Sequence, residues 1–316
     1  MTAAGSQTPV ILYITGSGRS GSTILHNLLC QLPGVVAVGE VRYIWDRGFR
    51  RDQMCGCGSS VRSCPFWTAV AESAFGGMDR VPYDRLAELT ERWRIKDLPA
   101  ATLPVLGARK MAAVAELTEA LSRLYRAIAE VSQSDVIVDS SKNPASGYAV
   151  KTIEEVDFRA LHFVRDAPAV AYSWSMPRKS QPGLSLRQQT PLAAAMQWNV
   201  RNLAAELYLR GNYRRMRYED FVADPEGNLS RLATWIGHER DRFPLDGNRA
   251  EISQANHSVF GNEVRLKRGV VEIRRDDRWR SEMAATDRRR VAAVTFPLRV
   301  RYGYVGRTSQ LDEVAR

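Results

Sequence analysis

VILYITGSGRSGST, at residues 10–23, is the stretch that decides the fold. Its first half, Val10–Ile14, is a short apolar run typical of a strand that is buried on both faces of a parallel sheet. Glycine and serine follow at once, and residues 22–31 then have apolar side chains at helical spacing. A strand, a turn of small residues and a helix together predict an anion site. The turn lets backbone N–H groups face an anion, and the helix N-terminus adds partial positive charge.

The turn holds the candidate anion ligands, which are Gly18, Arg19, Ser20, Gly21, Ser22 and Thr23. Their spacing is close to the ATP-binding Walker A pattern, which has Lys directly after its last glycine. Here Ser22 has that position, and the cation is Arg19, two residues before Gly21. The moved cation favours a 5′-phosphosulfate over the β- and γ-phosphates of a magnesium nucleotide. A turn without a ligand is the alternative, but so many small residues are costly unless something is bound.

Short β-like runs recur along the chain, at Val35–Val38, Val136–Val138, Leu161–Val164 and Tyr213–Tyr218. Helical patterns separate them, and the most regular one predicts a single amphipathic helix from Met111 to Val131. Two further helices have N-terminal capping residues, Thr190 and Asp224, each followed by proline. This alternation predicts right-handed βαβ units and the α/β class. We expect a P-loop-type three-layer α/β/α fold with a central parallel sheet.

The length and composition fit one soluble domain. We expect residues 1–316 to form it, with residues 46–106 as a mostly helical insertion and Pro177–Pro191 as a long loop of the kind that covers active sites. The net charge of +10 favours anionic partners, but the basic residues are spread along the chain and match no nucleic-acid-binding module. No apolar run approaches the ~20 residues that cross a bilayer, and no signal peptide is recognisable. A cytoplasmic enzyme is therefore expected.

Four cysteines, Cys30, Cys55, Cys57 and Cys64, are too few for a disulfide scaffold. The last three lie within ten residues, which leaves three interpretations open. They could join a zinc site, but a closed site needs four ligands and Cys30 would have to come close. They could form a disulfide through Cys64, or stay reduced in a compact loop, which we favour. We predict no metal.

The segment Arg19–Thr23 resembles the 5′-phosphosulfate loop of sulfotransferases that use 3′-phosphoadenosine 5′-phosphosulfate (PAPS). Its Arg-Ser-Gly form is typical of the carbohydrate and tyrosylprotein branches and of many bacterial members. The resemblance covers roughly residues 10–279 and is weakest over the insertion, which in that family shapes the acceptor pocket. It implies transfer of a sulfuryl group from PAPS to a hydroxyl acceptor, with release of 3′-phosphoadenosine 5′-phosphate (PAP).

Three further segments follow in the family's order. Arg165 at a strand end and Ser173 in the next helix resemble the 3′-phosphate site, and an Arg fork suits phosphate. Tyr218, in a Tyr-Glu-Asp step, is implied to lie near the nucleotide, with packing in the core as the alternative. Near the C-terminus, the resemblance assigns contact with the 3′-phosphate to Lys267, Arg268 and Gly269.

The candidate base is Glu40, because it follows a short strand at the edge where parallel sheets bind ligands, and the tyrosylprotein branch has a Gly-Glu step there. Arg19 and Lys142 are the cations expected to stabilise the leaving phosphate, and Ser258 could bind the sulfuryl oxygens. His257 is the alternative base. The alternative for Glu40 is a solvated glutamate at a strand end that pairs with Arg42 or another surface cation.

Two other functions compete. A P-loop kinase or NTPase would use Asp139 as a Walker B acid for magnesium, and the missing lysine argues against it. A nucleic-acid or anionic-surface binder rests only on charge, so we expect no nucleic-acid partner. The acceptor (a sugar, a glycolipid or a natural product) and the oligomeric state are not fixed by the sequence. Trp45, Trp67 and Trp93 of the insertion and its start would line the acceptor site or belong to the core.

Overall fold

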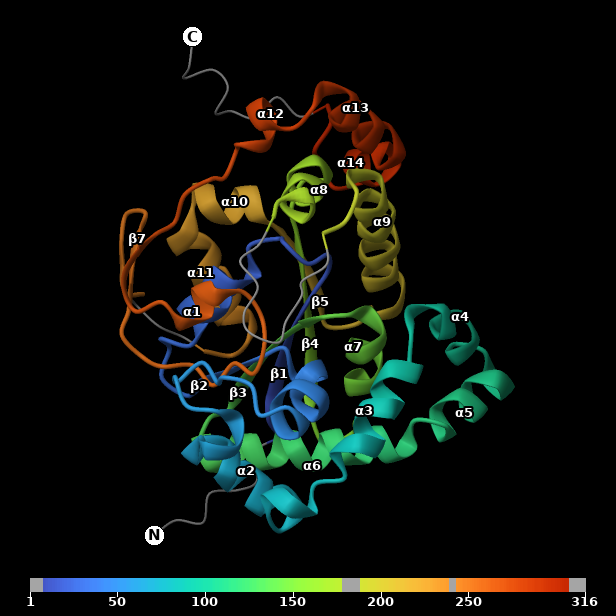
Figure 1. Ribbon diagram of the computed structural model, residues 1–316, viewed down its shortest axis with the longest axis vertical. Coiled ribbons are helices and arrows are strands. Elements are labelled where there is room, and N and C mark those ends of the chain that lie inside the picture. Colours follow the sequence, from blue (N-terminus) through green and yellow to red (C-terminus); the bar gives the residue numbers. More distant parts are fainter. Residues whose placement is uncertain (1–7, 178–187, 239–242, 307–316) are drawn as a thin grey trace.

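A five-stranded parallel sheet forms the centre of the computed structural model, which describes residues 8–177, 188–238 and 243–306 (Figure 1). The strand order is β2-β3-β1-β4-β5. Their bounds are β1 Val10–Thr15, β2 Val35–Gly39, β3 Val136–Lys142, β4 Asp157–Val164 and β5 Tyr213–Arg217. All five predicted strands are confirmed, and all neighbours pair in parallel.

The register brings the carboxyl ends of the strands to one edge. Thr15, the last residue of β1, lies opposite Lys142 on one side and His162 on the other. Val164 at the end of β4 lies opposite Arg217, where β5 ends because the next residue begins a helix. Polar residues that follow the strands are therefore collected at this edge.

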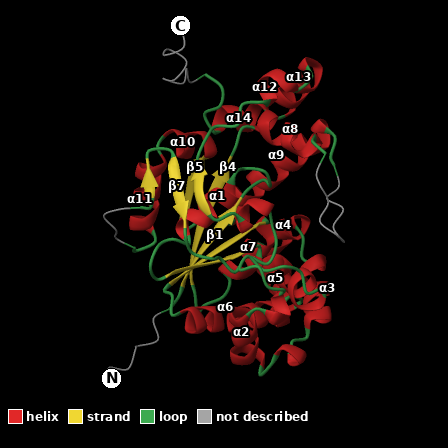
Figure 2. Cartoon of the chain, turned by 60° about the vertical axis from the view of Figure 1, so that its left-hand side comes forward, coloured by secondary structure: helices red, strands yellow, loops and turns green. Residues whose placement is uncertain are grey.

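Helices cover both faces of the sheet, which confirms the three-layer α/β/α fold (Figures 1 and 2). Successive side chains of β1 point to opposite faces: Ile11 belongs to one core cluster and Leu12 to the other. The first cluster packs against α2 (Pro65–Phe75), α3 (Tyr83–Arg92), α6 (Ala115–Ser132) and α7 (Pro144–Lys151). The second packs against α1 (Ser22–Leu29), α10 (Tyr218–Ala223) and α11 (Pro225–Trp235).

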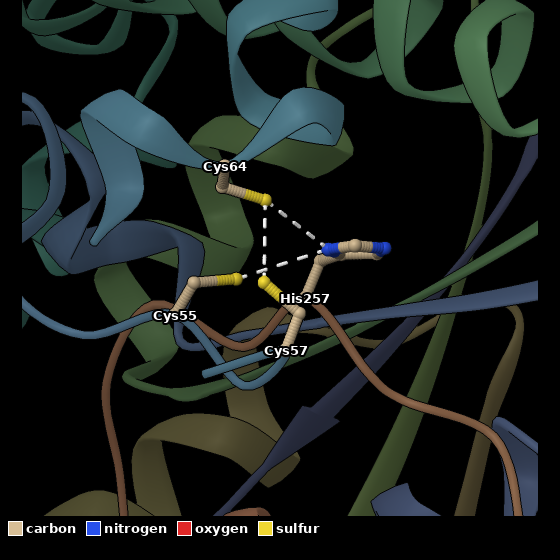
Figure 3. Close-up of side chains that lie close together, drawn as sticks. All are labelled: Cys55, Cys57, Cys64 and His257. Atoms are coloured by element: carbon tan, nitrogen blue, oxygen red, sulfur yellow. Dashed lines mark hydrogen bonds between the residues drawn. The ribbon is translucent and has the colours of Figure 1, made fainter. Parts of the chain in front are cut away.

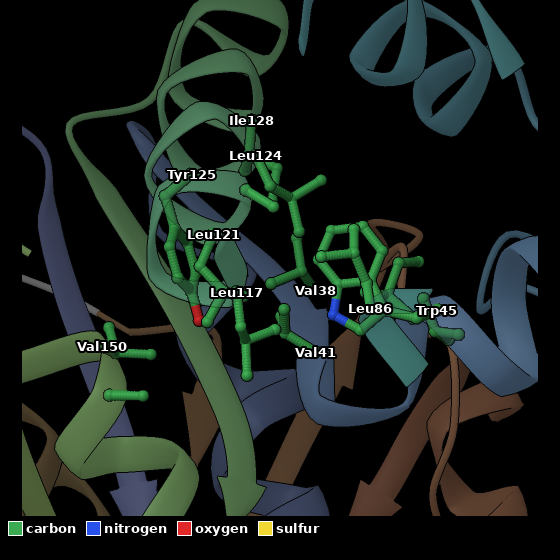
Figure 4. Packing of buried hydrophobic residues seen from close by; sticks show 14 of the residues in the cluster. Val38, Val41, Trp45, Leu86, Leu117, Leu121, Leu124, Tyr125, Ile128 and Val150 are labelled. Carbon is green, nitrogen blue, oxygen red and sulfur yellow. The ribbon is translucent and has the colours of Figure 1, made fainter. Parts of the chain in front are cut away.

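The stretch from residue 46 to 106 is mostly helical, as expected. It contains α2, α3, α4 (Leu98–Ala101) and the start of α5 (Pro104–Ala112). Trp45, Trp67 and Trp93 are at most 3% exposed and belong to the first core cluster, so the core interpretation holds for all three. Figure 4 shows Trp45 packed among Val38, Leu86 and the inner face of α6.

The helix predicted from Met111 to Val131 is two helices. The expected single helix is wrong because α5 ends at Ala112 and α6 begins at Ala115. Val114 separates them with a non-helical backbone (φ −120°) and is itself buried, so its apolar side chain fits the helical spacing across the break. The sequence pattern indicates which residues are buried, and an interruption of two residues does not disturb it.

Both predicted caps are confirmed. The Thr190 hydroxyl accepts from the Ala193 N–H (3.3 Å) at the start of α9 (Pro191–Tyr208), and Asp224 accepts from the Gly227 N–H (2.9 Å) at the start of α11. Most of the predicted loop from Pro177 to Pro191 lies outside the described residues.

A small antiparallel sheet with the order β6-β7-β8 was not predicted. Its strands are β6 Leu245–Asp246, β7 Arg249–Ile252 and β8 Gly269–Glu272. The remaining helices are α8 Ala167–Ser175, α12 Trp279–Glu282, α13 Ala285–Val294 and α14 Phe296–Arg301. Within the described residues, no helix combines the length and apolar character needed to span a membrane.

Candidate active site

A cleft of about 610 Å³ lies at the carboxyl edge of the parallel sheet, and all five strands contribute to it. The turn after β1 lines it, and so do Glu40 after β2 and Lys142 at the end of β3. Arg165 follows β4, and Tyr218 follows β5. Residues 200 positions apart are thus brought to one site by strand order alone, as expected for a parallel sheet.

The predicted anion turn faces this cleft. Gly18, Arg19, Gly21, Ser22 and Thr23 line it, whereas Ser20 is 2% exposed and is not among the described lining residues. Gly21 adopts a left-handed backbone (φ 82°) as the residue before α1. A Cβ atom here would lie 2.6 Å from the ring of Tyr218, so only glycine allows this ring to pack against the turn.

Both candidate cations have an unusual backbone. Arg19 (φ 72°) and Lys142 (φ 65°) are two of four non-glycine residues with positive φ in the described part of the chain. This conformation costs free energy for residues with a Cβ, and such residues cluster at functional sites. The Arg19 guanidinium lies 5.0 Å from the centre of the Trp174 ring, a cation–π contact at the cleft wall.

Glu40 and Lys142 form an ion pair in the lining of the cleft. Lys142 Nζ lies 2.6 Å from Glu40 Oε1, and both side chains are nearly buried, with 12% and 13% of their surface exposed. Two glycines let the chain pack closely around this pair. A Cβ on Gly39 (φ 78°) would lie 2.7 Å from the Cβ of Ser258, and a Cβ on Gly261 would lie 3.4 Å from Glu40 Oε1. The candidate base and a candidate catalytic cation are therefore in direct contact.

Arg165 is held with its guanidinium directed into the cleft. It lies 4.8 Å from the centre of the Tyr218 ring and donates to the backbone oxygens of Asp276 (2.7 Å) and Arg19 (3.4 Å). The Asp276 carboxylate is 3.4 Å away, and hydrogen bonding to Arg278 is the main cause that lowers its pKa. Ser173 on α8 lines the same cleft. The predicted pair Arg165 and Ser173 is thus brought together with the anion turn.

Ser258 lies beside the main cleft, in a small cavity that Glu40 and Lys142 also line. Its hydroxyl is buried and forms a 2.8 Å hydrogen bond with His26 Nε2. Burial lowers the pKa of His26 to about 3, so this imidazole is neutral near pH 7. His26 therefore orients Ser258 without adding charge.

The C-terminal basic pair does not reach this cleft. Lys267, Arg268 and Gly269 are exposed and are not among the described lining residues, and Arg268 donates to the Gly56 carbonyl (2.7 Å). Their contact with a 3′-phosphate stays a prediction. His257, the alternative base, also lies away from the described lining of the cleft.

Asp139 is directed into the protein. Its carboxylate accepts from the Tyr125 hydroxyl (2.6 Å) and the Ser141 N–H (2.8 Å), and it does not belong to the described lining of the cleft. Burial raises its pKa to about 6. An acid that holds magnesium beside a nucleotide must face the phosphates, so this geometry does not favour the Walker B interpretation.

Sequence reasoning missed several cleft residues. Arg201 in the middle of α9, Arg47 and Arg278 all face the cleft, as do Tyr43 and Phe260. With Arg19, Lys142 and Arg165, six basic side chains among the described lining residues face only two acidic ones, Glu40 and Asp276. Such an excess of positive charge in a concave site attracts a ligand with several negative charges.

Comparisons with known proteins give the family and the fold of this chain. The sequence model of a family described as "Sulfotransferase family" matches residues 9–242. No curated protein matches the sequence. Among solved structures, the chain is similar to the sulfotransferase domain from the curacin biosynthetic pathway, with a TM-score of 0.50 and 15% identity over 90% of this chain and 96% of that one. It is also similar to the sulfotransferase domain from the Synechococcus PCC 7002 olefin synthase, with a TM-score of 0.48 and 19% identity over 92% and 96%.

Proposed function

The chain belongs to the sulfotransferase family, and we propose that it transfers a sulfuryl group from PAPS to a hydroxyl acceptor and releases PAP. The observation that supports this most is the cleft itself. One cavity unites the anion turn after β1, the pair Arg165 and Ser173 after β4, and the ion pair of Glu40 and Lys142 from the ends of β2 and β3. PAPS has two anionic ends, a 5′-phosphosulfate and a 3′-phosphate, and needs two separate anion sites.

In this proposal, the anion turn binds the 5′-phosphosulfate through its backbone N–H groups and the hydroxyls of Ser22 and Thr23. Arg165 and Ser173 bind the 3′-phosphate. Tyr218 lies between the two sites, against Gly21 and under Arg165, where an aromatic ring can contact the nucleoside. Lys267, Arg268 and Gly269 would contact the 3′-phosphate only after a movement of the segment that carries them.

Glu40 is the proposed general base. It accepts the proton of the acceptor hydroxyl as that oxygen forms a bond to sulfur and the bond from sulfur to the 5′-phosphate oxygen breaks. The 5′-phosphate leaves as PAP with one more negative charge, which Arg19 and Lys142 stabilise. Lys142 Nζ contacts Glu40 and lines the same cleft as the anion turn, so it can serve both the base and the leaving phosphate. Ser258, oriented by His26, is proposed to bind a sulfuryl oxygen.

The acceptor is proposed to enter beside Tyr43, Arg47 and Phe260. Phe260 stacks at a tilt on Tyr43 (4.7 Å between ring centres) and lies under the Arg47 guanidinium (5.6 Å). A wall of aromatic rings and one cation suits a sugar, a glycolipid or a natural product with apolar surface. Among the described lining residues of the cleft, Arg47 comes from the stretch 46–106. We therefore propose that this stretch is an insertion that shapes the acceptor site, within a single domain of residues 1–316.

Thermal unfolding with nucleotides tests the donor. PAP at 100 times its dissociation constant stabilises the folded state by about 2.7 kcal/mol, which should raise the Tm by roughly 5 °C. AMP lacks the 3′-phosphate and should give a much smaller rise at the same concentration. A rise with magnesium ATP but not with PAP would contradict the proposal and favour a kinase or NTPase.

Arg165→Ala is expected to weaken PAP binding by about 10- to 100-fold, because hydrogen bonds from a charged group contribute roughly 1.5–3 kcal/mol. The affinity for AMP should change little, so the preference for PAP over AMP falls. Isothermal titration calorimetry measures both affinities. Arg165→Lys is the matched control, because it keeps the positive charge but loses the planar fork of the guanidinium. Its preference for PAP over AMP should lie between that of the parent protein and that of Arg165→Ala. An unchanged preference for PAP in Arg165→Ala would assign the 3′-phosphate to another site.

A further inference from the structure

Three cysteines and one histidine converge beside the cleft (Figure 3). Cys55, Cys57 and Cys64 come from the loop before α2, and His257 comes from the segment that precedes Ser258. Their three sulfurs and a ring nitrogen of the histidine all lie within 4.8 Å of one another. From the sequence, Cys30 was the candidate for a fourth ligand, but His257 takes that place and Cys30 is not part of the cluster.

We propose that these four side chains bind one zinc ion as a closed structural site. Tetrahedral zinc, with Zn–S of about 2.3 Å and Zn–N of about 2.0–2.1 Å, needs donor atoms about 3.5–3.8 Å apart. Cys64 Sγ and Cys55 Sγ lie 3.5 Å and 3.8 Å from His257 Nδ1, and Cys57 Sγ lies 3.5 Å from Cys64 Sγ. Three thiolates and one imidazole form a known structural set for zinc, and they are unlike the oxygen ligands that magnesium and calcium require.

The surroundings fix the ligands in this arrangement. The ring of Phe66 stacks on the imidazole of His257 (4.2 Å between centres, 16° between planes). The Trp67 indole N–H donates to the His257 carbonyl (3.0 Å). Around the thiols, the chain turns back on itself with a hydrogen bond from the Gly58 N–H to the Cys55 carbonyl (3.0 Å). Ring orientation and loop shape are therefore set by contacts outside the ligand atoms, as in metal sites of proteins.

Glycine at position 56 is another requirement of this loop. A Cβ there would lie 1.9 Å from the side-chain oxygen of Asn256, and the Gly56 N–H donates to the Ser258 carbonyl (2.9 Å). The cysteine loop is thus in backbone contact with the C-terminal segment on both sides of His257. A disulfide between two of the cysteines would need sulfurs about 2.05 Å apart and would leave the third thiol and the imidazole without a role. All four cysteines of the chain are free thiols in the structure.

Zinc bound at this site would hold one wall of the cleft in place. Cys64 and His257 are 193 residues apart, and an ion that joins them closes a long loop of the chain. The residue after His257 is Ser258, whose Cβ would lie 2.7 Å from a Cβ on Gly39. Gly261 follows, and a Cβ on it would lie 3.4 Å from Glu40 Oε1. Zinc would therefore hold the segment that borders Glu40, without contacting the reacting groups. This role goes beyond sulfuryl transfer and does not depend on it.

The test uses the full chain, purified in reducing buffer with one equivalent of ZnSO₄ and then desalted. Mass spectrometry of the metal content should find one zinc per chain, and a chelator that removes it should lower the Tm by about 5–10 °C. Cobalt in place of zinc should give the charge-transfer and d–d absorption of a tetrahedral thiolate site. This readout needs no variant and no activity.

Variants then assign the ligands. Cys57→Ser changes the most exposed of the three thiols and should abolish stoichiometric zinc, whereas Cys30→Ala, a buried thiol outside the cluster, should keep it. Less than about 0.1 zinc per chain in the parent protein, or a native protein with two of its four thiols oxidised, would overturn the proposal. Zinc retained by Cys57→Ser with an unchanged cobalt spectrum would overturn it as well.

Discussion

Glu40→Gln is expected to lower turnover by about 10²–10⁴-fold, the range that general base catalysis contributes. Glutamine has the shape of glutamate, and its side-chain oxygen can still accept from Lys142 Nζ, now 2.6 Å from Glu40 Oε1. The substitution therefore removes the basic group while the cleft stays intact. PAP affinity, measured by calorimetry, should change less than about threefold, because the proposed nucleotide ligands are not altered. The rate is measured as release of PAP with the best acceptor from a panel of phenols and sugars.

A control separates this effect from loss of a negative charge in general. Glu119→Gln replaces an exposed glutamate on α6, away from the cleft, and should keep full turnover. Parent-like turnover of Glu40→Gln would contradict the role of base. In that case the near-buried pair with Lys142 would be structural, which its geometry also allows, and Glu40→Gln would lower the Tm instead.

The fold was predictable because its strands are short apolar runs buried on both faces. β1, β2, β3 and β4 carry the signal of a parallel sheet in their own composition, and a polar residue directly follows β2, β3 and β4. Glu40, Lys142 and Arg165 could be placed together from this fact alone, since parallel strands end at one edge. Features that are local in the sequence, or that follow from the strand order, could therefore be predicted.

The missed features depend on tertiary packing. Arg201 lies in the middle of α9 and lines the cleft, although it follows no strand of the sheet. Nothing in its neighbourhood distinguishes it from an exposed helical arginine. The small sheet of β6, β7 and β8 has strands of two to four residues, too short for a periodic signal. His257 lies far along the chain from the thiols that it meets, and no spacing rule joins them.

Replacing Arg19 is expected to lower kcat by about 10²–10³-fold, the usual loss when one donor to a developing negative charge is removed. Arg19→Ala removes the guanidinium that lies over Trp174, next to the turn that is proposed to bind the phosphosulfate. Arg19→Lys keeps a charge without the planar fork and should recover part of the rate. Kinetics with saturating PAPS measure the change in kcat, and titration with PAP measures binding separately.

Arg19→Gly gives a sharper test, because this variant should lose activity while its stability stays close to that of the parent protein. At φ 72° the backbone of Arg19 is strained, and glycine removes this cost of roughly 1 kcal/mol from the folded state. Glycine also raises the conformational entropy of the unfolded chain, which disfavours folding by a free energy of similar size. The Tm should therefore stay within about 2 °C of the parent, although the rate falls as in Arg19→Ala. Gln133→Gly is the matched control: it removes a left-handed residue (φ 50°) after α6, far from the cleft, and should raise the Tm slightly at full activity.

These two glycine variants test whether the strain at Arg19 is kept for function. A left-handed backbone aims the Arg19 side chain along the wall of the cleft while its carbonyl faces Arg165, 3.4 Å away. Because glycine is expected to leave the stability nearly unchanged at this position, selection for stability alone would not require arginine there. If Arg19→Gly keeps parent-like kcat, then the guanidinium does not stabilise the leaving phosphate, and Lys142 must do so without it. If the rate falls while the Tm holds, the cost of the strained backbone is explained by the transition state that this side chain stabilises.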